Sequence, residues 1–267
     1  MGARDSQQDC FEISNTIKLT DGTVGCLLIV ADGMGGHLGG FEASKIVVDE
    51  FTQAFAHVRS GIAETFEQAL NQSNYKIGKF VTGNPKYDGM GSTVVAVLIV
   101  EQTLYWLSVG DSPLWLIRNG QMQRLNEDHS LLPVLLKMAD MGEITTEEAH
   151  QDPKKHMLRS VIQGKPIKLI DSQFSPFALH PSDKLILASD GLHTLADDTI
   201  CTLVNTSSNK AVDTLLKKID TISDDNQDNT SVIIAMMDTE APFKVKPLQI
   251  TIMLITIMLI VVLIGVN

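Results

Sequence analysis

Apolar and polar positions alternate along the first part of the chain with two periods, one typical of strands and one typical of helices. Short runs rich in β-branched residues predict strands at residues 11–13, 26–30, 93–100, 103–109, 114–118, 122–125, 168–174, 184–189 and 231–237. Apolar residues at helical spacing predict helices at residues 41–58, 62–80, 195–204 and 210–219, and a more polar segment at 131–159 also favours helix. Asn119 and Gly120 separate two of the strands and predict a hairpin turn.

The order of these elements predicts the fold class. Antiparallel strands dominate, and the helices come in pairs rather than as one crossover helix for each strand. This order is typical of an α+β layered sandwich. At 267 residues the chain has room for one large domain or two small ones, and its length does not choose between them.

The last part of the chain has a different pattern, because residues 248–266 contain no charged side chain. A helix of this length would cover roughly 28 Å at about 1.5 Å per residue, close to the hydrocarbon thickness of a bilayer. Lys244 and Lys246 precede it, and positive charges favour the cytosolic side. We therefore predict a main domain at residues 1–240 in the cytosol, a linker at 241–247 and a single-pass transmembrane helix at 248–266 that anchors the chain to a membrane. A buried core helix is the alternative.

The charge balance is acidic, with a formal net charge of -11 and a pI near 5.0. Nucleic-acid phosphates select basic surfaces, so this balance argues against a nucleic-acid-binding protein. The acidic excess has two interpretations, a solvated surface or a set of aspartates that face a bound cation. Cys10, Cys26 and Cys201 are odd in number and far apart, which predicts a reducing compartment and neither a disulfide framework nor a zinc knuckle.

Five of the predicted strand ends carry an aspartate. They are Asp9, Asp32, Asp111, Asp190 and Asp228. For any one of them, a loop carboxylate that stabilises a turn is the simpler interpretation. Five together favour a site for Mg²⁺ or Mn²⁺, because these ions take hard oxygen ligands. No cluster of histidine or cysteine accompanies the aspartates, which argues against zinc.

The turn after Asp32 is rich in glycine, since residues 32–36 read Asp-Gly-Met-Gly-Gly. Glycine at this place lets the backbone come close to whatever the aspartate binds. A dinucleotide-binding loop would instead carry G-x-G-x-x-G at the start of a helix, without an acid in front. A carboxylate repels phosphate unless a metal ion lies between them, so the turn favours a metal site over a nucleotide site.

Seven short blocks resemble those of metal-dependent protein serine/threonine phosphatases of the 2C type, in the same order along the chain. The blocks are Arg4-x-x-x-Gln8-Asp9, Asp32-Gly33-Met34-Gly35-Gly36, Met90-Gly91-Ser92-Thr93, Val109-Gly110-Asp111-Ser112, Asp128-His129-Ser130, Ser189-Asp190-Gly191-Leu192 and Asp228-Asn229-Thr230-Ser231. Residues 129–164 are similar to the bacterial branch of the family, which has a mobile flap beside the active site. The resemblance implies two packed antiparallel β-sheets flanked by pairs of α-helices, a four-layer αββα sandwich, in agreement with the α+β pattern.

The resemblance also implies a set of metal ligands. It makes Asp32 a bridge between two Mn²⁺ or Mg²⁺ ions about 3.5 to 4 Å apart, with the Gly33 carbonyl on one of them. Asp190 and Asp228 would hold the other ion. Asp9 would orient bound water or complete the coordination shell.

Two further roles follow from the same resemblance. Asp111 resembles the residue that helps to hold a weaker third metal ion in bacterial members, and Arg4 would bind the substrate phosphate with its planar fork of donors. The resemblance makes Arg4, Asp9 and Asp32 the catalytic residues. The implied reaction is hydrolysis of phosphoserine and phosphothreonine in proteins by water activated between the ions. The implied partners are proteins phosphorylated by a serine/threonine kinase, and we expect a monomer.

Three positions depart from the family pattern. Gln8 stands where many members have Glu, Met34 where some eukaryotic members have a His proposed as general acid, and Pro113 where Arg usually follows Gly-Asp-Ser. With Met34 in that place, we expect metal-bound water to protonate the leaving alcohol. Pro113 removes a side-chain donor and restricts the backbone. Pro113, with only three residues before Arg4, motivates one alternative function: a catalytically weak or inactive, membrane-anchored module of the same fold that binds phosphoproteins.

Overall fold

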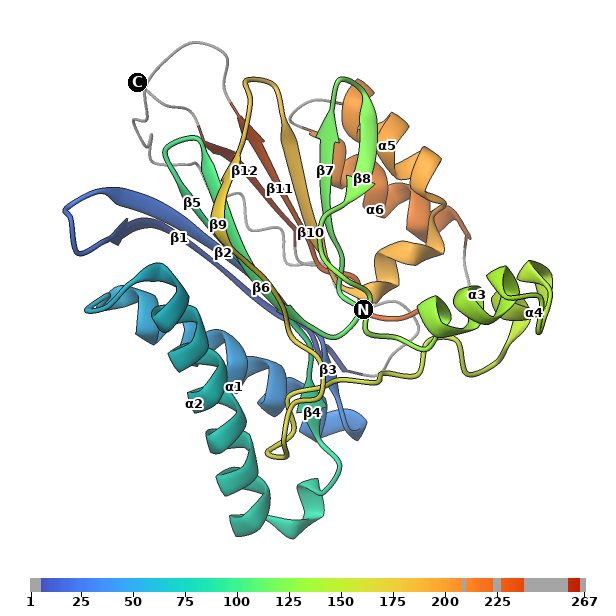
Figure 1. Ribbon diagram of the computed structural model, residues 1–267, viewed down its shortest axis with the longest axis horizontal. Helices are drawn as coiled ribbons and strands as arrows, with labels where there is room; N and C mark the ends of the chain where they lie inside the picture. The colour runs from blue at the N-terminus through green and yellow to red at the C-terminus, as the bar shows by residue number, and fades with distance from the viewer. Residues whose placement is uncertain (1–5, 208–209, 223–226, 238–258, 265–267) are drawn as a thin grey trace.

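The computed structural model describes residues 6–207, 210–222, 227–237 and 259–264 of the 267-residue chain. Two five-stranded β-sheets pack against each other, and a pair of helices covers the outer face of each sheet (Figure 1). All but one of the strand pairs in these sheets are antiparallel. The predicted α+β sandwich of two sheets with flanking helix pairs is therefore confirmed for the described residues.

The first sheet has the strand order β1-β2-β5-β6-β9 and is covered by α1 and α2. Its elements are β1 (Cys10–Lys18), β2 (Val24–Ala31), β5 (Val94–Val100), β6 (Thr103–Val109), β9 (Asp171–Ala178), α1 (Gly36–Ala56) and α2 (Ile62–Gly83). Alternate residues of β2 face opposite ways. Leu27 and Ile29 share a core cluster with the helices, whereas Leu28 and Val30 share one with the second sheet, as the period of a strand requires.

The second sheet has the strand order β12-β11-β10-β7-β8 and is covered by α5 and α6. Its elements are β7 (Leu114–Arg118), β8 (Gln121–Arg124), β10 (Lys184–Ala188), β11 (Val232–Met237), β12 (Leu259–Ile264), α5 (Asp197–Thr206) and α6 (Ala211–Ile222). The turn between β7 and β8 has φ of 53° at Asn119 and 77° at Gly120. Positive φ at both positions is typical of a two-residue hairpin, so the predicted hairpin is confirmed.

Smaller elements lie between and beside the sheets. They are β3 (Gly33–Met34), β4 (Gly91–Ser92), the 3₁₀ helices η1 (Pro85–Tyr87) and η2 (Asp190–Thr194), α3 (Leu132–Asp140) and α4 (Thr146–Gln151). The helices α3 and α4 fall in the predicted polar segment and project from the sandwich (Figure 1). Thr145 begins α4 with a capping box, because its Oγ1 accepts from the Glu148 N–H at 3.1 Å while Glu148 Oε2 accepts from the Thr145 N–H at 2.7 Å.

The predicted transmembrane helix at 248–266 is contradicted at residues 259–264, whereas 248–258 and 265–266 lie outside the described residues. Residues Leu259–Ile264 form β12, which pairs in parallel with β11 from Val232 opposite Leu259 to Met237 opposite Ile264. An apolar run rich in β-branched residues suits a buried strand as well as a helix, and periodicity does not separate the two. No helix in the described part of the chain has the length and hydropathy needed to cross a bilayer, so the predicted membrane anchor and single-pass location are corrected. The predicted linker at 241–247 lies outside the described residues.

Candidate active site

Four of the predicted site aspartates meet at one edge of the two sheets. In an antiparallel sheet the end of one strand lies beside the start of the next, so residues at these points gather together. Asp32 follows β2 and Asp111 follows β6 in the first sheet, while Asp190 follows β10 and Asp228 precedes β11 in the second. All four line a single cavity of about 660 Å³.

The fifth aspartate, Asp9, is buried beside this cavity with 5% of its surface exposed. Its Oδ2 accepts a hydrogen bond from Ser189 Oγ at 2.7 Å, whereas its buried Oδ1 has no hydrogen-bond partner among the described residues. Burial raises the pKa of Asp9 to about 6. The bond from Ser189 opposes this rise, and the charges of Asp190 and Asp228 increase it. We call the five aspartates, Asp9, Asp32, Asp111, Asp190 and Asp228, the cavity floor.

Asp32 is held through its backbone at the junction of β4 and β5. Its N–H donates to Thr93 Oγ1 at 3.1 Å, and its carbonyl accepts from the Thr93 N–H at 2.8 Å and from Ser92 Oγ at 3.0 Å. Burial raises the pKa of the Asp32 carboxyl well above its usual value, and the charges of the other four floor aspartates raise it further. A negative charge on Asp32 is therefore unfavourable unless a cation offsets it.

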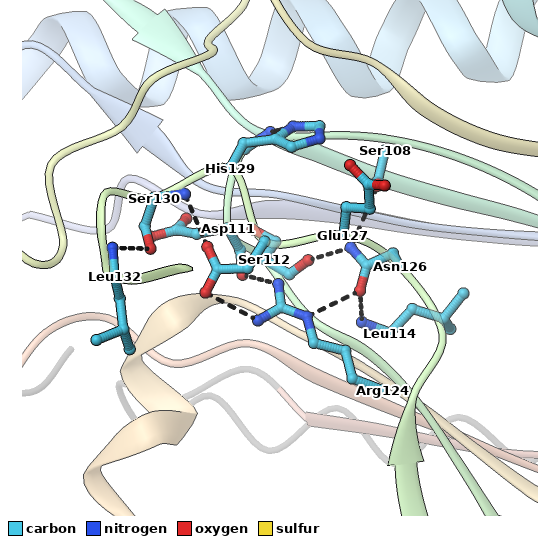
Figure 2. Close-up of polar contacts among 12 residues, drawn as sticks. Ser108, Asp111, Ser112, Leu114, Arg124, Asn126, Glu127, His129, Ser130 and Leu132 are labelled. Atoms are coloured by element: carbon cyan, nitrogen blue, oxygen red, sulfur yellow. Dashed lines mark hydrogen bonds and ion pairs between the residues drawn. The ribbon is translucent and has the colours of Figure 1, made fainter. Parts of the chain in front are cut away.

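An arginine on β8 fixes the turn that carries Asp111 (Figure 2). Arg124 Nη2 donates to the Asp111 carbonyl at 2.7 Å, and Arg124 Nη1 lies 3.3 Å from Asp128 Oδ2. Burial raises the pKa of Asp111 to about 7, with further increases from the charges of Asp190 and Asp128 and a smaller, opposite effect of Arg124. Arg124 thus orients the backbone of this turn without neutralising the carboxylate.

A chain of hydrogen bonds connects the Asp111 turn to Asp32. Asn126 Nδ2 donates to the Ser112 carbonyl at 2.9 Å (Figure 2). Ser112 Oγ lies 2.7 Å from Thr93 Oγ1, the same atom that accepts from the Asp32 N–H. Two of the floor aspartates are consequently fixed relative to each other by buried hydroxyl groups.

The turns that carry Asp190 and Asp228 pack backbone to backbone. Gly191 follows Asp190, and a Cβ at this position would collide with the carbonyl oxygen of Asn229. Only glycine permits this approach. Asn229 Oδ1 also accepts from the Gln8 N–H at 2.8 Å, which brings the segment before β1 to the same place.

Gly33, the predicted carbonyl ligand, lines the cavity beside Asp32. It pairs with Ser92 in the short β3–β4 sheet. A Cβ at Gly33 would collide with the backbone of Gly40 in α1 and with the Gln8 carbonyl. The glycine is therefore required for the close packing of α1 against this turn.

Sequence analysis identified the aspartates but not the residues that hold them. Ser112 directly follows Asp111 in the sequence, so a signal for its role was present. Arg124 and Asn126 have no comparable signal, because only the β7–β8 hairpin brings them to the Asp111 turn.

One predicted site residue, Arg4, lies outside the described residues. Its contact with a substrate phosphate stays a prediction.

The cavity floor has the chemistry to bind divalent cations. Its carboxylates raise each other's pKa, and one buried oxygen of Asp9 has no described hydrogen-bond donor. A bound cation would offset both the repulsion between the carboxylates and the cost of burying that oxygen. The carboxylates are spread around the cavity. Within the described ranges, no three acidic, histidine or cysteine side chains cluster tightly enough to enclose an ion by themselves.

Comparison with known proteins gives consistent matches over most of the chain. A family model described as protein phosphatase 2C matches residues 5–232. The serine/threonine phosphatase Stp of Listeria monocytogenes is 32% identical over 221 residues, which cover 79% of this chain and 84% of that protein. The serine/threonine phosphatase of S. agalactiae superposes with a TM-score of 0.70 at 27% identity, covering 85% of this chain and 91% of that one.

A second solved structure that is similar in fold is the catalytic domain of the serine/threonine protein phosphatase PstP in complex with two manganese ions. It has a TM-score of 0.70 and 24% identity, and the match covers 88% of this chain and 94% of that one.

Proposed function

This chain belongs to the protein phosphatase 2C family, and from that premise we propose that it hydrolyses phosphoserine and phosphothreonine in proteins with two bound divalent cations, Mn²⁺ or Mg²⁺. The observation that carries the proposal is the gathering of Asp32, Asp111, Asp190 and Asp228 around one cavity. The catalytic domain would span residues 1–240, which include the matched residues 5–232.

Each residue of the cavity floor has a proposed part in holding the cations, and that of Asp9 would be to orient bound water or complete the coordination shell. Asp32, Asp190 and Asp228 would bind the two ions with their carboxylates, and Gly33 would add its carbonyl oxygen. Asp111, on the separate turn oriented by Arg124, would hold a weaker third ion. The two manganese ions in the similar PstP structure support this choice of metal.

When bound, the cations would lower the pKa of a water molecule and offset the negative charge on the phosphoryl oxygens. The contribution of the chain is to keep its ligands in place before substrate arrives, which lowers the cost of reorganisation during the reaction. Ser189 fixes Asp9, and Thr93 fixes Asp32. Arg4 would bind the phosphate.

The alternative function, a catalytically weak or inactive binding module, gains no support from the described residues. A protein that had lost catalysis would be expected to have lost acids at the site. Here Asp32, Asp111, Asp190 and Asp228 all line the cavity, and Asp9 is held beside it.

The test is hydrolysis of phosphoserine, phosphothreonine and phosphotyrosine peptides by the full chain with Mn²⁺. We expect release of phosphate from the first two peptides and loss of that activity on chelation with EDTA. Asp190→Asn should lower kcat/KM at least about a hundredfold, because it removes a charged ligand.

The matched control is Asp213→Asn, which removes the charge of an exposed aspartate on α6 and should leave activity unchanged. Full activity in EDTA, or equal activity of the Asp190→Asn and Asp213→Asn variants, would contradict the proposed function.

A further inference from the structure

The cavity has a second group of lining residues, which come from the chain after α4. They are His156, Met157, Leu158, Val161 and Gln163, and we call them the cavity wall. This wall differs in kind from the acidic floor. His156 and Met157 are exposed, and the other wall side chains are apolar or neutral.

Backbone hydrogen bonds hold the chain on both sides of His156. The Leu132 N–H donates to the Lys155 carbonyl at 2.9 Å, and the Met157 N–H donates to the Lys154 carbonyl at 2.8 Å. Leu158 then pairs with Ser130 in an isolated bridge. The position of His156 is therefore set by its neighbours, while its own side chain stays accessible from the cavity.

The wall is also attached directly to the floor. Ser92 and Ile162 exchange two backbone hydrogen bonds, each of 3.0 Å. Ser92 Oγ in turn donates to the Asp32 carbonyl at 3.0 Å. Farther along, the Gly164 N–H donates to Asn74 Oδ1 of α2 at 2.8 Å, which fixes the end of the wall segment.

His156 is chemically distinct within the cavity. Among the described lining residues, it is the one side chain that can carry a positive charge near neutral pH, because the others are aspartates or neutral residues. Hydrolysis of an alkyl phosphate needs a proton donor, and a histidine in the cavity is an alternative to the metal-bound water expected from the sequence. The alkoxide of serine or threonine is a poor leaving group unless it receives a proton as the P–O bond breaks.

We propose that His156 is the acid that donates this proton to the leaving oxygen of phosphoserine or phosphothreonine, an inference that rests on the proposed function. As the bond between phosphorus and the side-chain oxygen breaks, its electron pair goes to that oxygen, which takes a proton from the imidazolium. The attacking water supplies the new oxygen on phosphorus, and its proton returns the imidazole to the protonated form. The products are the alcohol and inorganic phosphate, so the step balances.

The experiment compares two leaving groups in the full chain with Mn²⁺. A phosphoserine peptide needs a proton on its leaving oxygen, whereas p-nitrophenyl phosphate releases a stabilised anion that does not. His156→Gln should lower the ratio of kcat for the peptide to kcat for the aryl phosphate roughly a hundredfold. Added imidazole should partly restore peptide hydrolysis in His156→Ala.

The matched control is His150→Gln, which removes an exposed histidine on α4 that is not among the cavity-lining residues. It should leave the ratio unchanged. If His156→Gln slows both substrates equally, or slows neither, His156 is not the acid, although the proposed function stands. If the unmodified chain hydrolyses neither substrate, the proposed function itself is wrong and this inference fails with it.

Discussion

The floor of the cavity is fixed by hydrogen bonds to its aspartates and their turns, whereas the wall is fixed through its backbone and leaves the side chains of His156 and Met157 exposed. Asp9 and Asp111 of the floor are 5% and 7% exposed, and Asp32, Asp190 and Asp228 are half-buried. Met157 of the wall is 54% exposed. Hydrogen bonds therefore hold the floor aspartates in place, while the exposed side chains of the wall have room to adapt to a bound substrate.

The difference between floor and wall assigns two tasks to two parts of one site: chemistry to the floor and contact with the protein substrate to the wall. Cation binding and attack on phosphorus need groups that do not move, and buried hydrogen bonds provide this rigidity. Contact with a protein substrate needs surface that can be reached, and exposed methionine is an adaptable apolar contact. Substitutions in the floor should therefore affect every substrate, and substitutions in the wall should discriminate between substrates.

The largest effect is expected from Asp32→Asn in the floor. It should lower kcat/KM at least about a hundredfold for both a phosphopeptide and p-nitrophenyl phosphate, because a charged ligand is lost. In EDTA the same variant should unfold at a higher temperature than the unmodified chain, since repulsion among the floor carboxylates is reduced. Steady-state kinetics and thermal unfolding measure the two effects. A variant that loses activity and is also destabilised without metal would indicate a structural role instead.

The second effect concerns the pH dependence of stability in the metal-free protein. Burial raises the pKa of Asp111 from 3.8 to about 7, so between these values the unfolded state binds fewer protons and the aspartate costs stability as pH rises. Asp111→Asn should therefore stabilise the protein in EDTA by an amount that grows from about pH 4 to about pH 7, reaching a few kcal/mol. Urea unfolding at several pH values measures this.

Asp213→Asn, at an exposed position, is the control and should show no such trend. A stabilisation by Asp111→Asn that is constant with pH would contradict the expectation.

A smaller effect is expected from Ser189→Ala, which removes the hydroxyl between Asp9 and the Ser231 N–H. Those two hydrogen bonds are 2.7 and 2.9 Å long and buried. Their loss should lower the free energy of unfolding by about 1–3 kcal/mol. It should also reduce kcat for the phosphopeptide and for p-nitrophenyl phosphate, by the same factor for each. Ser175→Ala, at an exposed position on β9, is the control. Unchanged stability and turnover in Ser189→Ala would show that Asp9 does not need this support.

The smallest effect is expected in the wall. Met157→Ala should raise KM for a phosphopeptide roughly fivefold through loss of apolar contact, with little change for p-nitrophenyl phosphate. Met141→Ala is the matched control, because Met141 is 59% exposed but does not line the cavity. Equal effects of the two substitutions on peptide KM would mean that the wall does not contact the substrate.

Much of the floor could be predicted from sequence because its signals are local. Each aspartate stands at the end of an apolar run, and the antiparallel order brings such ends together. The family assignment made from the motif blocks is confirmed by the match over residues 5–232. The Asn119-Gly120 turn was predictable for a similar reason, since two residues with positive φ define that hairpin.

Other features depend on contacts between distant parts of the chain. Ser189 lies 180 positions from Asp9, and nothing in either segment indicates that one holds the other. His156 stands in no motif block, and although residues 129–164 resemble a flap beside the active site, only the fold shows that His156 itself lines the cavity. At Leu259–Ile264 the apolar run fits a strand and a membrane helix equally well in composition, and its pairing with β11 decides for the strand.

The most direct test of the account is a titration of the full chain with Mn²⁺ in which ion binding and phosphopeptide hydrolysis are measured on the same sample. We expect two ions bound tightly per chain, activity that rises with their occupancy, and loss of both in Asp32→Asn. Hydrolysis of the peptide at full rate with no bound ion, or unaltered ion binding in Asp32→Asn, would contradict it.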